Sequence, residues 1–142
     1  MNNDETKYMK EAMRLAKKAY LLGEVPVGVI ISDEKGILSR AYNKKEKNKL
    51  ATHHAEIIAI EKACKKKKDW RLNNCTMYVT LEPCAMCKGA IEECRIKKVV
   101  YATEDNNKIA HKKPIEMIQI NNKKINIESK LLLQSFFKEK RL

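Results

Sequence analysis

The sequence predicts an α/β domain of three layers, α/β/α, with a mixed central sheet of about five strands. Apolar runs of strand length alternate with helical patterns along most of the chain, which is typical of βαβ units and parallel strands. The first two apolar runs, residues 25–31 and 37–42, are separated only by a short turn around Gly36. They are therefore expected to form an antiparallel hairpin, and this makes the sheet mixed.

The N-terminal half contains one helix before this hairpin. Apolar and small residues recur at three and four residues between positions 5 and 22, which predicts an amphipathic helix that ends at Gly23. Gly28 stands inside the first strand, and this indicates the close approach of another backbone or of a ligand. Residues 43–52 are polar and basic, and we expect a loop there.

The central third continues the alternation. A helix is expected from the first turn around His54 to about Lys68, with Thr52 as its cap. Thr76–Leu81 is the next buried strand, a helix follows from about Cys84, and residues 98–102 form a further strand. The pattern weakens after Tyr101. We expect a polar loop over 103–113, a short helix over 114–120, a short strand over 124–128 and a terminal helix over 129–141, in which Phe136 and Phe137 pack onto the body.

Length and composition limit the class of protein. A chain of 142 residues, 44% hydrophobic and 34% charged, fits one soluble domain over residues 1–142. No apolar run reaches the length of a membrane span, and residues 1–5 lack the basic and apolar parts of a signal peptide. These features favour a cytoplasmic location with no membrane partner.

The net charge of +12 suggests a polyanionic partner. Lys44, Lys45, Lys47, Lys49 and Lys108 stand close in sequence to the expected site and could neutralise phosphates. However, lysine-rich runs such as residues 65–68 are usually solvated helix ends. Both interpretations of the charge stay open.

Two short motifs carry the chemistry: His54-Ala55-Glu56 and Pro83-Cys84-Ala85-Met86-Cys87. One imidazole and two thiolates suit Zn²⁺, and three protein ligands leave the fourth tetrahedral position for a water. Cys84 and Cys87 share one face of a helix start, whose positive end favours the thiolate form. His54 and Glu56 are about 200° apart on a continuous helix, so they can share a pocket only at the helix tip.

Neither motif is specific when it stands alone. A strand followed by Cys-x-x-Cys is also typical of thiol oxidoreductases, and a zinc-stabilised RNA-binding module without activity is a further alternative. The pairing of His-x-Glu with Pro-Cys-x-x-Cys is the known signature of zinc-dependent nucleobase deaminases, in which the glutamate is the general acid/base. The other three cysteines, Cys64, Cys75 and Cys94, are expected to be packed thiols.

Over nearly its whole length the chain resembles the bacterial tRNA-specific adenosine deaminases of the cytidine deaminase-like superfamily. Beyond the metal motifs, the resemblance rests on residues 24–28 (EVPVG), 76–87 (TMYVTLEPCAMC) and 95–101 (RIKKVVY), and on Phe136-Phe137 with its basic tail. It implies the cytidine deaminase-like fold and deamination of adenosine to inosine at the wobble position of tRNA anticodon loops, by a homodimer. A deaminase of free guanine, cytosine or cytidine is the alternative.

The resemblance also implies roles for six residues. His54, Cys84 and Cys87 would hold one Zn²⁺ per chain, and Glu56 would carry the protons. Asn43 would hydrogen-bond the flipped-out base, and Asp105 would lie by the RNA backbone.

The chain departs from the family pattern in two places, both on the side expected to face RNA. Residues 106–111 contain no glycine, and the segment between Glu128 and Phe136 is shorter by about two helical turns. His53 stands next to the expected ligand, so either ring could be claimed by the metal, and the family pattern selects His54.

Overall fold

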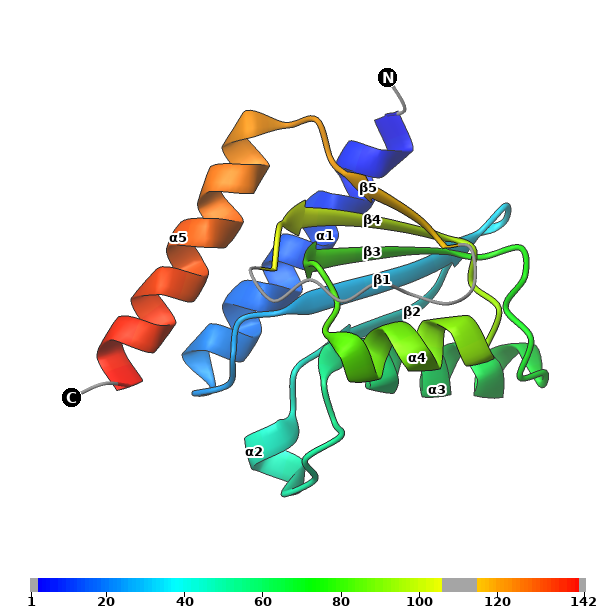
Figure 1. Cartoon of the computed structure of the whole chain (residues 1–142), viewed down its shortest axis with the longest axis horizontal. Coiled ribbons are helices and arrows are strands. Elements are labelled where there is room, and N and C mark those ends of the chain that lie inside the picture. The colour runs from blue at the N-terminus through cyan, green and yellow to red at the C-terminus, as the bar shows by residue number, and fades with distance from the viewer. Residues whose placement is uncertain (1–2, 106–114, 141–142) are drawn as a thin grey trace.

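The computed structural model describes residues 3–105 and 115–140, which form a twisted five-stranded sheet with helices on both faces (Figure 1). The strands are β1 (Gly28–Asp33), β2 (Gly36–Tyr42), β3 (Thr76–Leu81), β4 (Lys98–Thr103) and β5 (Glu116–Gln119). The helices are α1 (Asn3–Leu21), α2 (Lys45–Asn48), α3 (Ala55–Lys67), α4 (Ala85–Glu93) and α5 (Lys123–Lys140). The predicted three-layer α/β/α fold is confirmed.

The strand order is β2-β1-β3-β4-β5. β1 pairs antiparallel with both β2 and β3, whereas β3, β4 and β5 are parallel to one another. The β1–β2 hairpin is as predicted, and the sheet is therefore mixed. Because β3 and β4 are parallel, the chain segments that follow them leave the sheet at the same edge, where both Cys84 and Asp105 lie.

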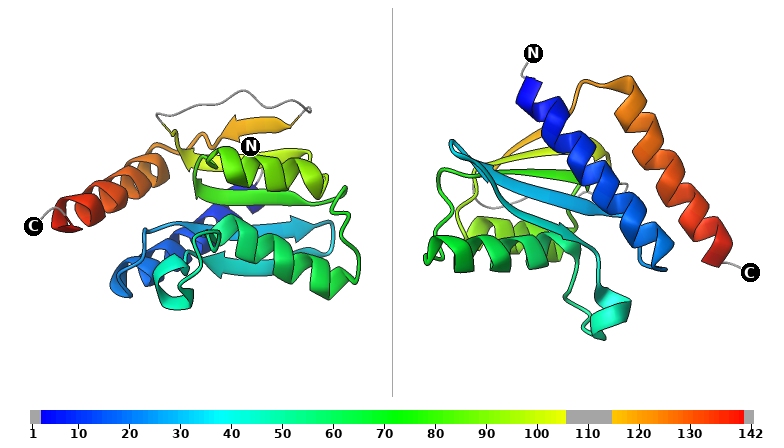
Figure 2. Two further views of the ribbon diagram at one scale, coloured as in Figure 1. Left: turned by 60° about the horizontal axis from the view of Figure 1, so that its bottom comes forward. Right: turned by 180° about the vertical axis from the view of Figure 1, so that it is seen from behind.

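Side-chain alternation in the strands divides the apolar core between two layers. Val29, Ile31, Met77 and Val79 point to the face covered by α3 and α4. Their neighbours Ile30, Tyr78, Val100 and Ala102 point to the face covered by α1 and α5. Seen from behind, α1 and α5 lie side by side across that face (Figure 2).

Two predictions for the C-terminal third were wrong. Residues 116–119 form strand β5 rather than part of a helix, because they pair in parallel with β4. Residues 124–128 belong to α5 rather than to a strand. The side chain of Asn122 accepts the backbone N–H of Ile125 at 3.1 Å, which caps the helix earlier than expected. The predicted loop residues 106–113, the start of the predicted helix at 114 and the end of the terminal helix at 141 lie outside the described residues.

Three smaller predictions also changed. The segment 43–52 contains the short helix α2, which lies at the bottom of the view in Figure 1. Thr52 does not cap α3, because the helix starts later, at Ala55, with the extended residue His54 at its N-cap. Phe136 is buried and meets Tyr20 of α1 edge to face, as expected of a residue that packs on the body, whereas Phe137 is 48% exposed.

Gly28 shows why α1 can lie so close to the sheet. A Cβ atom at this position would stand 1.9 Å from the carbonyl oxygen of Ala12 and 2.7 Å from the backbone nitrogen of Ala16. The predicted close approach is therefore that of the α1 backbone. Neither atom belongs to a flexible side chain, so a methyl group could be accommodated only by moving the helix.

We expect Gly28→Ala to lower the free energy of unfolding by about 3 kcal/mol or more, because the added methyl group forces α1 away from β1. Denaturant unfolding would measure the loss. Gly89→Ala in α4 is the matched control, since a Cβ there meets no atom within 4 Å and alanine gains up to about 1 kcal/mol in a helix. Equal stability of Gly28→Ala and the wild type would contradict the described contact between α1 and β1.

Candidate active site

Two helix starts meet at the carboxyl end of β3. His54 is the N-cap residue of α3 and Cys84 is the N-cap residue of α4, and both have extended backbone dihedrals. Neither side chain makes a capping hydrogen bond, so both are available to the site. Because His54 precedes the helix, its side chain and that of Glu56 in the first turn line the same pocket. The arrangement meets the requirement that the pocket sit at the helix tip.

The three predicted metal ligands converge. Nδ1 of His54 lies 3.7 Å from Sγ of Cys84 and 3.6 Å from Sγ of Cys87, and the ligand atoms of the three residues all lie within 4.8 Å of one another. Tetrahedral Zn–S and Zn–N bonds would place sulfur and nitrogen about 3.6 Å apart. The spacing and the donor types therefore fit Zn²⁺. The side chain of His53 does not belong to this cluster, and its Nδ1 lies 2.9 Å from Nδ2 of Asn48.

The two thiols of this cluster are hydrogen-bonded to each other. A hydrogen bond from Cys87 lowers the pKa of Cys84 to about 5, and the same contact, together with burial, raises the pKa of Cys87. Metal ligation requires both groups as thiolates, so a bound cation would take the place of the proton in that hydrogen bond. Burial also raises the pKa of Cys64, Cys75 and Cys94, which are free thiols.

Glu56 is 5% exposed and lies beside these ligands. Burial raises the pKa of its carboxyl group to about 7, and the charge of His54 opposes part of that rise. A carboxyl group with a pKa near neutrality can both accept and donate a proton within one reaction cycle. The structure thus puts a carboxyl group with a pKa near neutrality next to the three predicted metal ligands.

A pocket of about 150 Å³ encloses this site. Asn43, which is 4% exposed, and Asp105 both line it, from the segments that follow β2 and β4. All the predicted site residues are therefore gathered at one place, with Cys87 behind Cys84 in the ligand cluster. The other residues that line the pocket come from neighbouring segments: Val25, Val27, Lys45, Leu81 and Glu82.

Three polar residues near the pocket had no predicted role. The carboxylate of Glu82 lies 3.7 Å from Nζ of Lys88, with both side chains almost fully buried, and it accepts the backbone N–H of Asp105 at 3.0 Å. Glu24 is 2% exposed and contacts Asn43. The only sequence signal was position, since Glu82 directly follows a buried strand and Lys88 lies one helical turn after Cys84.

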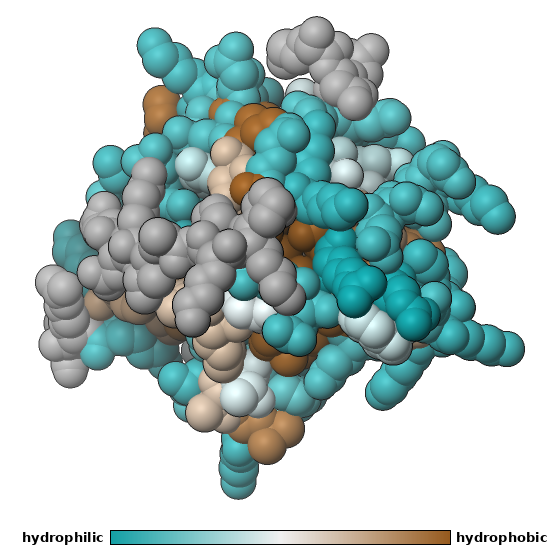
Figure 3. All heavy atoms as spheres, turned by 45° about the vertical axis from the view of Figure 1, so that its right-hand side comes forward, coloured by the Kyte–Doolittle hydropathy of each residue, from teal (hydrophilic) through white to brown (hydrophobic). Residues whose placement is uncertain are grey.

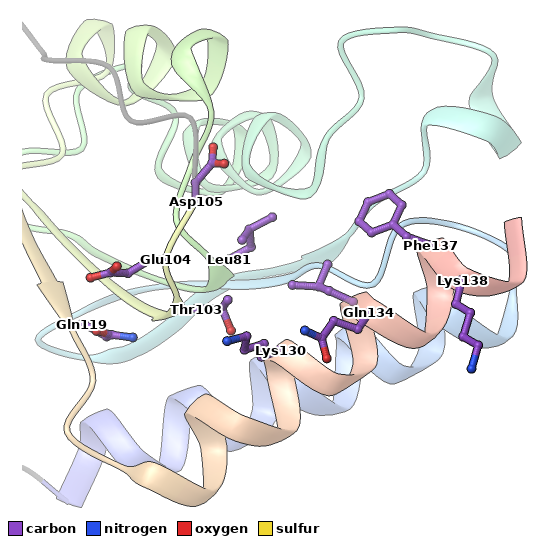
Figure 4. Close-up of a pocket in the computed structure, with 10 residues that line it drawn as sticks. Leu81, Thr103, Glu104, Asp105, Gln119, Lys130, Gln134, Phe137 and Lys138 are labelled. Atoms are coloured by element: carbon purple, nitrogen blue, oxygen red, sulfur yellow. The ribbon is translucent and has the colours of Figure 1, made fainter. Parts of the chain in front are cut away.

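A larger second pocket of about 1060 Å³ adjoins the first and shares Leu81 and Asp105 with it. Figure 4 shows the α5 side chains along this pocket, with the ring of Phe137 toward the C-terminal end of α5. Lys130 and Lys138 also line it from α5. The enclosed site therefore opens beside a groove that carries an exposed aromatic ring and two ammonium groups.

The face in Figure 3 is largely hydrophilic, with only small hydrophobic patches. None of the helices in the two described ranges is both long enough and apolar enough to cross a bilayer.

A mixed sheet with an imidazole, two thiols and a buried glutamate at the carboxyl end of a parallel strand defines the class of nucleobase deaminases. The particular family follows from the sequence as a whole. The chain belongs to the MafB19-like deaminase family, whose model matches residues 3–141.

Relatives within the deaminases agree with the resemblance noted in the sequence. The tRNA-specific adenosine deaminase of Bacillus subtilis (strain 168) is 47% identical over 105 residues, which are 74% of this chain and 65% of that protein. The chain's match thus spans just under two thirds of that relative's length. The tRNA-specific adenosine deaminase of Streptococcus pyogenes serotype M18 is 34% identical, and the match covers 97% of this chain and 92% of the length of that protein. The resemblance to tRNA-specific adenosine deaminases is confirmed.

Solved structures give the same fold. A tRNA:A34 deaminase studied for A-to-I editing at the wobble position superposes with a TM-score of 0.82 and 30% identity, over 90% of this chain and 99% of that one. Guanine deaminase from Bacillus subtilis has a TM-score of 0.67 and 28% identity, over 100% of this chain and 96% of its own.

The pKa of Glu56 leads to a testable effect on stability. Its folded value of about 7 exceeds the ordinary 4.5, so ionisation between these pH values destabilises the folded state. We expect Glu56→Gln to raise the free energy of unfolding of metal-free protein by on the order of 3 kcal/mol above pH 7 and to change it little below pH 4.5.

Denaturant unfolding at pH 4 and pH 8 with a chelator would measure this effect. The exposed Glu34→Gln removes the same charge from the surface and is the control. A difference between Glu56→Gln and wild type that does not vary with pH would contradict the raised pKa.

Proposed function

We propose that this protein deaminates adenosine to inosine at the wobble position of a tRNA anticodon loop, with Zn²⁺ held by His54, Cys84 and Cys87. The observation that carries the proposal is the buried Glu56 in one small pocket with the metal-ligand triad. A site that only stabilised the fold would not need a titratable carboxyl group there. The names of the relatives support the choice of adenosine in tRNA.

The chemistry is hydrolytic. Zn²⁺, when bound, lowers the pKa of a coordinated water to about 7 and so makes hydroxide available at neutral pH. Glu56 would accept a proton from a water in the pocket and donate it to ring N1, which makes C6 of adenine electrophilic, and the oxygen of that water would add to C6. Glu56 would then take the proton of the new hydroxyl group on C6 and pass it to the amino group, so that the C6–N bond breaks, ammonia leaves and a C6 carbonyl remains. Its raised pKa suits both directions of transfer.

The pocket walls suit a single flipped base. Val25, Val27 and Leu81 provide apolar surface, and Asn43 and Asp105 provide polar groups at the rim. In this proposal Asn43 hydrogen-bonds the base and Asp105 lies beside the RNA backbone, where a ribose hydroxyl could reach it.

The adjoining pocket favours RNA over a free nucleoside. Unpaired bases stack on aromatic side chains, and Phe137 is exposed beside Lys130 and Lys138. The charge of +12 and the lysines of α2 would hold phosphates on either side of the target base. A nucleotide next to the flipped adenosine could thus stack on Phe137 and place its phosphate beside the lysines.

A second candidate is the deamination of a free base such as guanine. A pocket of about 150 Å³ has room for a lone base, and guanine deaminase from Bacillus subtilis shares the fold. The same metal and the same glutamate would serve, so only the substrate separates the two candidates.

The assembly and location that go with this function are also proposals. We expect one catalytic domain over residues 1–142, a homodimer and a cytoplasmic location. Met86 on α4 is 38% exposed beside the site, where a partner subunit could cover it. A monomer mass from light scattering at micromolar concentration would rule out the dimer.

The substrate can be tested by comparing kcat/KM for an anticodon stem-loop with wobble adenosine against free adenosine, guanine and cytidine. We expect the stem-loop to be preferred. Phe137→Ala should lower kcat/KM on the stem-loop by about 5- to 150-fold, the equivalent of about 1–3 kcal/mol of stacking. It should leave any activity on free bases unchanged. Equal or better activity of the wild type on a free compound would reject tRNA as the substrate.

The metal and the base can be separated by two variants. Cys87→Ala should lose most of the roughly one zinc per chain, together with stability, because binding is coupled to folding. Glu56→Ala should keep its zinc but lose about 10²–10⁴ in kcat. Metal analysis and turnover would be measured on the same samples. Normal turnover of Glu56→Ala, or wild-type activity without zinc, is the result that contradicts these roles.

A further inference from the structure

Glu24 is a buried carboxylate outside the metal site. It stands between α1 and β1 with 2% of its surface exposed. Its backbone N–H donates to the carbonyl of Ala19 at the end of α1, so its position is fixed by the body of the protein. A buried carboxylate is costly unless hydrogen bonds satisfy it, and the donors to Glu24 come from the far side of the β1–β2 hairpin.

The first donors belong to α2. The backbone N–H groups of Glu46 and Lys47 donate to the two oxygens of Glu24 at 3.0 and 2.8 Å. These are the second and third residues of the helix, whose N–H groups an N-cap side chain usually accepts. The N-cap residue of α2, Lys44, makes no such bond. Glu24 therefore caps α2 from a distant point in the chain.

The other donor is the side chain of Asn43. Its Nδ2 lies 3.4 Å from Oε1 of Glu24. Only the amino end of an amide can face a carboxylate, so this contact decides the orientation of the Asn43 side chain. The carbonyl end is then left to accept a hydrogen bond from a nucleoside in the pocket.

We propose that Glu24 is a positioning residue for substrate recognition, which orients the Asn43 amide and holds α2 with Lys45 at the rim of the pocket. This inference rests on the proposed binding role of Asn43. Other bonds anchor the ends of the segment, from N–H of Asn43 to the carbonyl of Val27 and from N–H of Lys44 to the carbonyl of His53. Loss of the Glu24 carboxylate should therefore disturb orientation more than folding.

A double-mutant cycle tests the inference. Glu24→Gln, Asn43→Ala and the double variant are compared by kcat/KM on the anticodon stem-loop. We expect Glu24→Gln to lose on the order of 10- to 100-fold, as a misplaced contact does. The double variant should lose less than the product of the two single losses, because Glu24 acts in part through Asn43. Zinc content should stay at the wild-type value, since the side-chain hydrogen bonds described for Glu24 join it to Asn43, Glu46 and Lys47 rather than to a proposed ligand.

Glu46→Gln is the matched control. It makes the same chemical change on α2 itself, at an exposed side chain that lies outside the pocket lining. We expect wild-type activity from it. If Glu24→Gln does not fold, Glu24→Asp takes its place, because aspartate keeps the charge but draws the oxygens back by one methylene group.

A second readout needs no substrate. Amide hydrogen exchange at Glu46 and Lys47 should be faster in Glu24→Gln than in wild type, whereas Glu46→Gln should leave exchange at Lys47 unchanged. Unaltered exchange in Glu24→Gln, unaltered kcat/KM, or a double variant whose loss is the product of the single losses would each overturn the inference.

The substrate assignment can fail separately. If the wild type prefers a free base to the stem-loop, the proposed tRNA function falls. The same cycle, run on that base, still decides whether Glu24 acts through Asn43.

Discussion

The site depends on one geometric constraint, the meeting of two helix starts at the edge where β3 ends. Residues at an N-cap are extended, and their side chains usually turn back to bond the first turn. His54 and Cys84 do not, so an imidazole and a thiol are left to face each other. The first turn of each helix then supplies one further group, Glu56 from α3 and Cys87 from α4. The positive ends of the helices favour the thiolate form of cysteine, which is the form that binds a metal ion.

Three buried glutamates surround the pocket, and their partners differ. Glu24 receives N–H groups of α2, and Glu82 receives Lys88 and the N–H of Asp105. Burial raises the pKa of Glu56 to about 7, because its hydrogen bonds and the charge of His54 offset the effect of burial only in part. A buried carboxylate that accepts several hydrogen bonds can hold neighbouring segments in place, whereas a carboxyl group with a pKa near 7 can exchange protons near neutrality. The same residue type thus serves two purposes according to its neighbours.

Much of the fold and the candidate site could be predicted from short-range patterns. Thr76–Leu81 was predicted with the boundaries that β3 has, and the two metal motifs identify the residues that meet in the pocket. The errors came where long-range contacts decide. β5 is a strand because β4 is beside it, and α5 begins early because of the Asn122 cap. Glu24 had no predicted role because its donors lie about twenty residues away, in a segment that appeared to be loop.

The two adjoining pockets are built from different parts of the fold. The enclosed pocket is built by β3, α3, α4 and the segments around Glu24 and Asn43, so its shape is tied to the core. The larger pocket is lined chiefly by α5 and by residues at and beyond the end of β4. Only Leu81 and Asp105 belong to both, and Glu82 fixes Asp105 from the enclosed side. Changes along α5 therefore reach the larger pocket, whereas His54, Glu56, Cys84 and Cys87 lie on other elements and keep their places. The segment between Glu128 and Phe136, which was expected to be shorter than in the family, belongs to α5 and lines only the larger of the two pockets.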